Sequence, residues 1–148
     1  MRGRIMAIDF GLRRVGIAVS DPLGLLAHDR QPLHYQSMQS LLQQLCAIVQ
    51  AEEIETIIVG LPLRMDGSEG EMVEVVRRFT ARLSEKVAAP VVLWDERFTS
   101  VQAERLLTER GIKFSRRKGE VDRLAAVFIL QSYLDSLTRQ KTLEKNSD

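Results

Sequence analysis

Residues 4–20 read RIMAIDFGLRRVGIAVS, and this stretch decides the fold. It holds two apolar runs, which are joined by a short link that contains a glycine. Such a pattern predicts a β-hairpin, whose strands we place at Arg4–Asp9 and Val15–Ser20. A third strand is expected within Leu25–Leu33, although Pro32 fits poorly inside a sheet. The chain is therefore expected to open with three antiparallel strands.

Downstream of the hairpin, segments with helical spacing alternate with short β-branched runs. Helical crossovers would make the last two strands parallel to the first. The fold class is therefore α/β, with a mixed five-stranded sheet whose first three strands are antiparallel and whose helices cover both faces. Thr99 and Gln102 resemble a capping box at a helix start. The expected segments are a helix at Ser37–Ala51, a strand at Thr56–Gly60, a helix at Glu69–Val87, a strand at Pro90–Trp94, a helix from Thr99 to Arg110 and a helix at Glu120–Leu137.

The totals of the sequence bound the size and class of the protein. With 148 residues, of which 45% are hydrophobic, we expect one domain over residues 1–137 and a polar, flexible tail over 138–148. Aromatic residues make up only 5%, which argues against base stacking as the main mode of binding. The net charge of +1 neither indicates nor excludes a nucleic-acid partner, because a basic patch can hide within it. The single cysteine, Cys46, and the absence of any long apolar run predict a soluble cytoplasmic protein.

Acids follow the strands where ligands gather in such sheets, beyond the carboxyl ends of the parallel strands. Asp9 directly follows four apolar residues, and burial of a lone carboxylate is costly unless a cation compensates it. Asp95 and Glu96 are adjacent, so only one of them can face the site. We favour Glu96 and expect Asp95 to contact Arg97 or a neighbouring backbone group. Asp122 begins the final helix, and the small alanines that follow it could bring this helix close to the strand ends.

Each acid also has an ordinary structural role open to it. Asp9 could cap the turn that follows it, and the acids at 95 and 96 could form a solvated strand end. Asp122 could simply favour the dipole of its helix. The convergence of the acids on one edge of the sheet is what favours a binding site over these roles.

Carboxylates that gather without histidine or cysteine favour hard cations, so this set predicts a Mg²⁺ or Mn²⁺ site. Two such ions suit hydrolysis of a phosphodiester bond, since one activates water and the other stabilises the leaving oxygen. Both histidines, His28 and His34, fall in the third-strand region and are expected at the surface, which argues against zinc.

Cationic side chains flank these acids along the chain. A charge run is usually a solvated loop, but cations beside a carboxylate site are also what a polyanionic backbone needs in order to approach it. The candidate nucleic-acid-binding residues are Arg13, Arg14, Arg97, Lys113, Arg116, Arg117 and Lys118.

Several blocks follow one another in this sequence: Ala7–Gly11 with Val15–Val19, Val59–Leu63 with Met65–Gly67, Asp95–Ser100, and Lys118–Gly119 with Val121–Ala126. In this order they resemble the YqgF family. The family is similar to RuvC-type Holliday junction resolvases and has a ribonuclease-H-like fold. The resemblance implies that Asp9, Glu96 and Asp122 are the catalytic, metal-binding acids.

Members of this family are described both as Holliday junction resolvases and as nucleases that process the 5′ end of precursor 16S ribosomal RNA. We therefore predict a metal-dependent endonuclease that acts on this structured RNA in ribosome biogenesis, as a monomer or homodimer. The alternative is a resolvase of branched, four-way DNA junctions, which should be a stable dimer because it cuts two strands symmetrically.

Two further classes stay open at this point. One is an actin-like or sugar-kinase-like ATPase, for which the chain is too short to supply a second lobe. The other is a nucleic-acid binder without catalysis, against which the intact set of acids argues. No membrane partner is expected.

Overall fold

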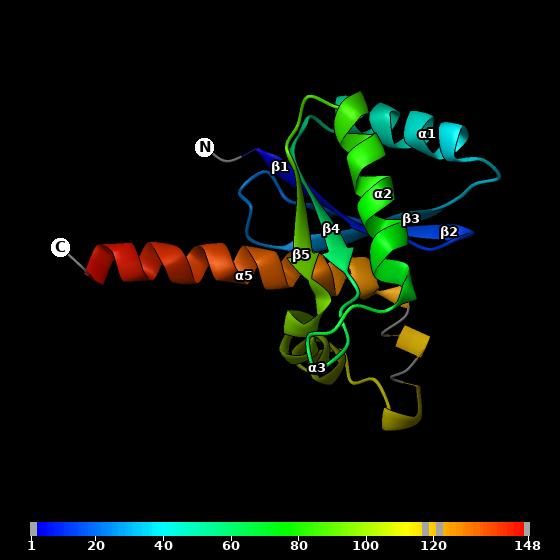
Figure 1. The fold of residues 1–148 in the computed structure, drawn as a ribbon. Helices are drawn as coiled ribbons and strands as arrows, with labels where there is room; N and C mark the ends of the chain where they lie inside the picture. Colours follow the sequence, from blue (N-terminus) through cyan, green and yellow to red (C-terminus); the bar gives the residue numbers. More distant parts are fainter. Residues whose placement is uncertain (1–2, 117–118, 121–122, 147–148) are drawn as a thin grey trace.

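The computed structural model describes residues 3–116, 119–120 and 123–146, and a sheet of five strands lies at its centre (Figure 1). The strands lie in the order β3-β2-β1-β4-β5. β1 and β3 both pair antiparallel with β2, whereas β4 runs parallel to β1 and β5 runs parallel to β4. This is the mixed α/β sheet that the sequence predicted. The bounds are β1 Arg4–Asp9, β2 Arg14–Ser20, β3 Ala27–His34, β4 Ile54–Leu61 and β5 Val91–Asp95.

Helices cover both faces of the sheet (Figure 1). α1 and α2 pack on one face and α5 crosses the other. Alternate side chains of β1 serve the two cores, since Met6 and Ile8 pack toward α1 and α2 while Ile5 and Ala7 pack toward α5. Across the described residues, no helix is both long and apolar enough to span a bilayer. The bounds are α1 Met38–Ala51, α2 Glu71–Lys86, η1 Glu96–Thr99, α3 Ser100–Glu109, η2 Phe114–Arg116 and α5 Ala125–Asn146.

The end of the last helix differs from the sequence prediction. α5 does not end at Leu137 but continues to Asn146, and its side chains are exposed from Thr138 onward. This segment contains no glycine or proline and is rich in Arg, Gln, Lys, Leu and Glu, which are good helix formers. The helix can therefore extend into solvent without burying an apolar face, and the described part of the predicted flexible tail is helical.

The predicted capping box at Thr99 is also wrong. Thr99 is itself in a helical conformation, and its hydroxyl donates a hydrogen bond of 2.8 Å to the carbonyl oxygen of Glu96. Gln102 is buried instead, and its amide donates a hydrogen bond to Asp135 of α5 at 3.4 Å. The reason is that η1 runs directly into α3, so the helical segment begins at Glu96 rather than at Thr99.

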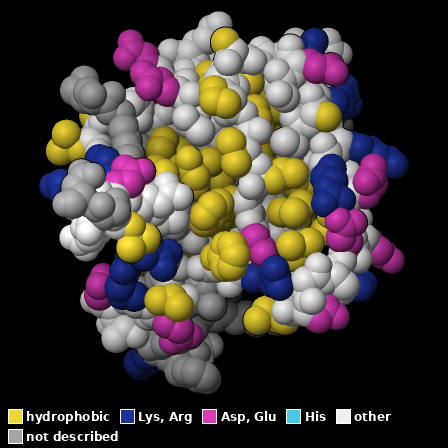
Figure 2. All heavy atoms as spheres, turned by 60° about the vertical axis from the view of Figure 1, so that its left-hand side comes forward, with side chains coloured by type: hydrophobic (Ala, Val, Ile, Leu, Met, Phe, Trp, Pro, Cys, Tyr) yellow, Lys and Arg dark blue, Asp and Glu magenta, His cyan; other side chains and the backbone are white. Residues whose placement is uncertain are grey.

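One face of the molecule gathers apolar side chains at its middle and charged side chains toward its margin (Figure 2). β5 lies at the edge of the sheet, and its Val92 is 39% exposed. The neighbouring Trp94 packs edge-on against Phe98 and Tyr133, with ring centroids 5.8 Å and 5.2 Å away, and donates a hydrogen bond of 3.1 Å to Ser132. Trp94 therefore fixes the end of β5 against η1 and α5.

Candidate active site

Asp9 ends β1, the middle strand of the sheet, and it lies on the face that α5 covers. Its partner in the neighbouring strand is Gly16. A Cβ atom placed on Gly16 would lie 3.4 Å from the Cβ of Asp9 and 3.6 Å from the Cβ of Ala126. Gly16 therefore lies between Asp9 and the first turn of α5, at ordinary contact distance from both.

Glu96 follows β5 directly and reaches over β4 toward the same place. A Cβ atom placed on Gly60 would lie 2.5 Å from Oε1 of Glu96 and 2.6 Å from Cδ1 of Ile129 in α5. Real Cβ atoms essentially never make contacts this short, so a side chain at position 60 would displace the ends of the Glu96 and Ile129 side chains. Because Ile8 of β1 pairs with Val59, the residue before Gly60, the carboxylate of Glu96 comes to lie beside the end of β1.

The ionisation of Glu96 reflects this position. Burial raises the pKa of its carboxyl to about 7, and repulsion by the charges of Asp9 and then of Asp95 adds to the rise. In the part of the chain that the structure describes, no hydrogen bond or ion pair to the Glu96 side chain offsets this cost. Glu96 therefore carries a carboxylate that a cation would stabilise.

Asp95 contacts Arg97, as the sequence analysis expected. The Arg97 guanidinium donates to both carboxylate oxygens, and the shortest distance, from Nη2 to Oδ2, is 2.7 Å. The backbone N–H of Arg97 donates to the same carboxylate at 2.9 Å. Hydrogen bonds from the Arg97 side chain hold the pKa of Asp95 below its usual range, against the opposite effect of partial burial. The negative charge of Asp95 is thus balanced by Arg97 of the same chain.

Arg97 also holds the loop that follows β4. Its Nη1 donates a hydrogen bond of 3.4 Å to the carbonyl oxygen of Met65. Gly67 has a positive φ of 86°, and a Cβ atom there would lie 3.3 Å from the same Nη1. In the structure the Arg97 guanidinium is engaged by Asp95 and by this loop, and a contact of Arg97 with nucleic acid stays a prediction.

The remaining predicted residues divide into two groups. Arg13, Arg14, Lys113 and Arg116 are exposed, and among them Arg14 lines the same pocket as Asp9. The predicted residues outside the described part of the chain are Asp122, Arg117 and Lys118.

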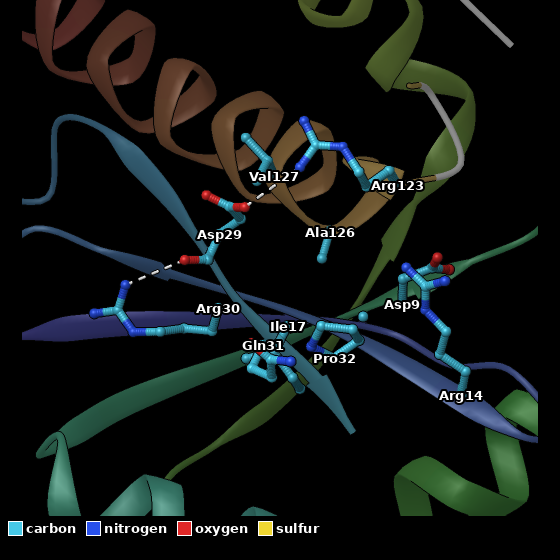
Figure 3. A pocket seen from close by; sticks show the side chains of 11 residues that line it. Asp9, Arg14, Ile17, Asp29, Arg30, Gln31, Pro32, Arg123, Ala126 and Val127 are labelled. Carbon is cyan, nitrogen blue, oxygen red and sulfur yellow. Dashed lines mark hydrogen bonds and ion pairs between the residues drawn. The ribbon is translucent and has the colours of Figure 1, made fainter. Parts of the chain in front are cut away.

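Residues that follow position 122 in the chain are described, and two of them lie at the site. Arg123 and Ala126 line the same pocket as Asp9 (Figure 3). Small alanines were expected to bring this helix against the strand ends, and Ala126 does lie at Gly16 of β2. No three metal-ligating side chains gather within the described ranges, where Asp9 and Asp95 are the acids whose charges act on Glu96.

A family model described as Holliday junction resolvase, RuvX, matches residues 3–136. The chain belongs to the RuvX family. This confirms the resemblance to the YqgF family that the sequence motifs indicated. Membership of a nuclease family also confirms the prediction of an enzyme and rejects the ATPase alternative.

Curated relatives of this RuvX chain match it over most of their length. One from Koribacter versatilis is 47% identical over 135 residues, which cover 91% of this chain and 88% of the relative. One from Syntrophus aciditrophicus is 41% identical over 138 residues, which cover 93% and 92%. Both bear the name "Putative pre-16S rRNA nuclease".

Among solved structures, the RuvX chain is similar to RuvC of Thermus thermophilus. RuvC in complex with a Holliday junction substrate gives a TM-score of 0.63 at 13% identity, covering 93% of this chain and 96% of that chain. A second T. thermophilus RuvC structure gives a TM-score of 0.54 at 12% identity, covering 87% and 92%. At these identities the likeness shows the fold, which is of the ribonuclease-H-like, RuvC type as predicted.

Sequence reasoning missed the two glycines that lie beside the acids of this RuvX site. Gly16 and Gly60 lie inside strands, where a glycine often marks a close approach of another group. That signal is present in the sequence and could have located both positions. The pocket residues Arg123 and Gln31 carried no comparable signal, because an isolated polar residue does not reveal which cavity it lines.

Proposed function

We propose that this protein is a metal-dependent endonuclease of the cytoplasm that processes the 5′ end of precursor 16S ribosomal RNA in ribosome biogenesis. The observation that carries the proposal is that Asp9 and the buried Glu96 lie close enough for their charges to repel each other. The names of the relatives support the choice of RNA. Two acids brought together at a site open to solvent are the basis of metal-assisted phosphodiester hydrolysis.

The donor set fits a hard divalent cation. Asp9, Glu96 and, by our proposal, Asp122 would hold Mg²⁺ or Mn²⁺ through carboxylate oxygens. Binding of a cation would offset the burial and the repulsion that raise the pKa of Glu96 to about 7. Two ions bound in such a site would activate water and stabilise the charge on the leaving oxygen.

The chain's own residues bind and orient the substrate. Arg14 is exposed beside Asp9 in the same pocket, so it can hold a phosphate close to the acids. Lys113 and Arg116 are exposed on the segment before the final helix and can contact the backbone further away. Such contacts position a nucleic acid without reading its sequence.

A decisive experiment compares the parent chain with Asp9→Asn in the presence of Mg²⁺ or Mn²⁺. The substrates are a ribosomal-RNA precursor end and a four-way DNA junction. We expect the parent to cut the RNA, and Asp9→Asn to bind it with similar affinity but leave it intact. If Asp9→Asn cuts as fast as the parent, the assignment of the metal site is wrong.

The description of the family model favours a second candidate, the resolution of four-way DNA junctions. In the same experiment this function predicts that the parent cuts the junction at symmetric positions and leaves the RNA intact. It also predicts a stable dimer in solution, which sedimentation of the parent chain would measure. A monomer that cuts only the RNA removes this candidate.

The basic residues before the final helix have their own test. Replacement of Arg116, Arg117 and Lys118 by alanine should weaken RNA binding and flatten the dependence of log K on log salt. The slope should change by about 0.7–0.9 for each phosphate that the variant no longer neutralises. The slope is measured by titration at several salt concentrations. An unchanged slope would mean that this loop is solvated and does not contact the backbone.

A further inference from the structure

A cavity of about 690 Å³ opens beside Asp9, between the strands β2 and β3 and the beginning of α5 (Figure 3). Binding sites for small molecules and cofactors commonly have volumes of about 300–1,000 Å³, so the cavity has room for a nucleoside-sized group. Asp9 lies at one end of it, and Asp29 and Arg123 face each other at the other. Whatever enters this cavity therefore lies next to the proposed metal site.

An irregularity of the sheet shapes the cavity. Val15 of β2 pairs with Leu33, but Ile17 pairs with Arg30, so that Gly16 alone faces two residues of β3. Such a bulge bends the strand and redirects its side chains, and bulges are frequent next to active sites. The two residues opposite Gly16 are Gln31 and Pro32, and both line the cavity. Since Pro32 has no N–H to give to the ladder, it suits a bulge rather than a regular strand.

The charges around the cavity are not equivalent. Arg30 points away from Asp9. Its Nη2 and Nε donate hydrogen bonds of 2.8 Å and 3.1 Å to Glu52. Arg123 is held by Glu120 at 2.8 Å and lies 3.8 Å from Asp29 across the mouth. Arg14 forms no ion pair with any described residue. Arg14 is thus the cation that remains available to an incoming phosphate, and it lies close to Asp9.

The rest of the lining suits a nucleobase. Ala126 and Val127 of α5 give an apolar wall, and Gln31 adds an amide that both donates and accepts hydrogen bonds. A flat base can pack on the apolar wall while the amide contacts its edge. Proteins that recognise single-stranded RNA commonly hold unstacked bases in this way.

We propose that this cavity receives one unstacked nucleotide of the substrate strand, next to the phosphate that is cut, with Arg14 on its phosphate and Gln31 on its base. The inference rests on the proposed function, because it supplies the strand that enters the cavity. It adds a specificity element, since cleavage then requires a nucleotide that can leave its stack at one defined position. A fully paired helix would not place a base there.

The test is a double-mutant cycle that combines Gln31→Ala with removal of one base from the RNA, and it is measured by binding alone. RNA affinity is measured by fluorescence anisotropy in the Asp9→Asn background, with an abasic site moved one nucleotide at a time through the precursor end. We expect one position at which removal of the base weakens binding about tenfold, the usual worth of one good contact. At that position the effect should shrink to less than about threefold when Gln31→Ala is also present, because the two changes remove the same interaction.

Gln43→Ala on the exposed face of α1 is the matched control, and it should leave the tenfold effect unchanged. If no position of the abasic site couples to Gln31→Ala, the nucleotide pocket is refuted, while cleavage of the RNA by the parent would still support the proposed function. If coupling is found but the parent cuts no RNA, the pocket stands and the proposed nuclease activity is wrong. The coupled position must also border the cut, and coupling elsewhere along the strand overturns the assignment.

Discussion

The end of β5 carries two neighbouring acids that lie on opposite faces of the sheet. Asp95 pairs with Leu61, which packs toward α1 and α2, and there it accepts hydrogen bonds from Arg97 that lower its pKa. Glu96 lies on the face of α5, against Ile129, where burial and the charge of Asp9 raise its pKa to about 7. The same type of group thus meets a partner on one face and a like charge on the other.

The difference separates a structural carboxylate from a functional one. Asp95 is satisfied within the chain and holds a loop in place, so nothing from outside is needed. Glu96 is placed where its charged form costs free energy, and such a position is retained when a ligand offsets the cost. Substitutions on one face can therefore be compared with matched substitutions on the other.

The largest effect is expected from neutralising each acid in turn. Glu96→Gln should lower the rate of metal-dependent RNA cleavage by more than about a hundredfold, since even residues that only support metal ligands cost about 10- to 100-fold when they are replaced. Asp95→Asn should cost less than about tenfold in the same single-turnover assay. Equal decreases in the two variants would contradict the division of roles.

Two glycines, Gly60 beside Glu96 and Gly67 beside Arg97, should separate an effect on activity from an effect on stability. Gly60→Ala forces its Cβ against Glu96 and Ile129, and a displacement of about 1 Å at an active site can cost about a hundredfold in rate. Gly67→Ala is the matched change on the other side, where a positive φ and the Arg97 contact make it destabilising by about 1 kcal/mol. Cleavage rates and urea unfolding are measured for both variants. We expect the larger loss of rate in Gly60→Ala and the larger loss of stability in Gly67→Ala, and the reverse would refute the prediction.

The pKa of Glu96 predicts how stability depends on pH. The folded, metal-free protein holds this proton up to about pH 7, whereas the unfolded chain releases it near the usual value of 4.5, so stability falls as pH rises between these values. Glu96→Gln should therefore stabilise the metal-free protein by up to about 3 kcal/mol at pH 8, and hardly at all at pH 4. Urea unfolding with a chelator measures this, and a gain that does not depend on pH would rule out the assigned cause.

The smallest effect is expected at Arg97. Arg97→Ala should destabilise the protein by about 1 kcal/mol, because it leaves the partly buried Asp95 without its partner. Arg97→Lys should recover part of this stability, since a lysine keeps the positive charge but lacks the planar guanidinium that donates to both oxygens of Asp95. Thermal unfolding measures both variants. RNA binding at several salt concentrations then tests whether Arg97 also contacts the backbone, for which a flatter slope is required.

Much of the fold could be read from local patterns. The strand at Arg4–Asp9 was predicted with its observed bounds, because an apolar run that ends in an acid leaves little ambiguity. The first long helix was predicted within one residue, since Ser37 caps it through its side chain. The third strand shifted to Ala27–His34, because its place is set by pairing with β2 and not by its own largely polar sequence.

The candidate site could be predicted only in part. The alternation of side chains implied that one of the two acids at 95 and 96 faces away, but the family resemblance was needed to choose Glu96. The partner of Asp95 was foreseeable from its neighbour Arg97. The pocket beside Asp9 was not, because it depends on the register between β2 and β3 and on the approach of α5, which are properties of the assembled sheet.

The bulge at Gln31 and Pro32 has a second consequence, for the behaviour of the protein at high concentration. β3 is an edge strand, and an exposed, regular edge can recruit a strand from another molecule and begin aggregation. The proline and the irregular spacing interrupt the row of free N–H and C=O groups along this edge. A deletion that restores a regular β3 would therefore close the cavity and, by the same change, leave the protein more prone to assemble edge to edge.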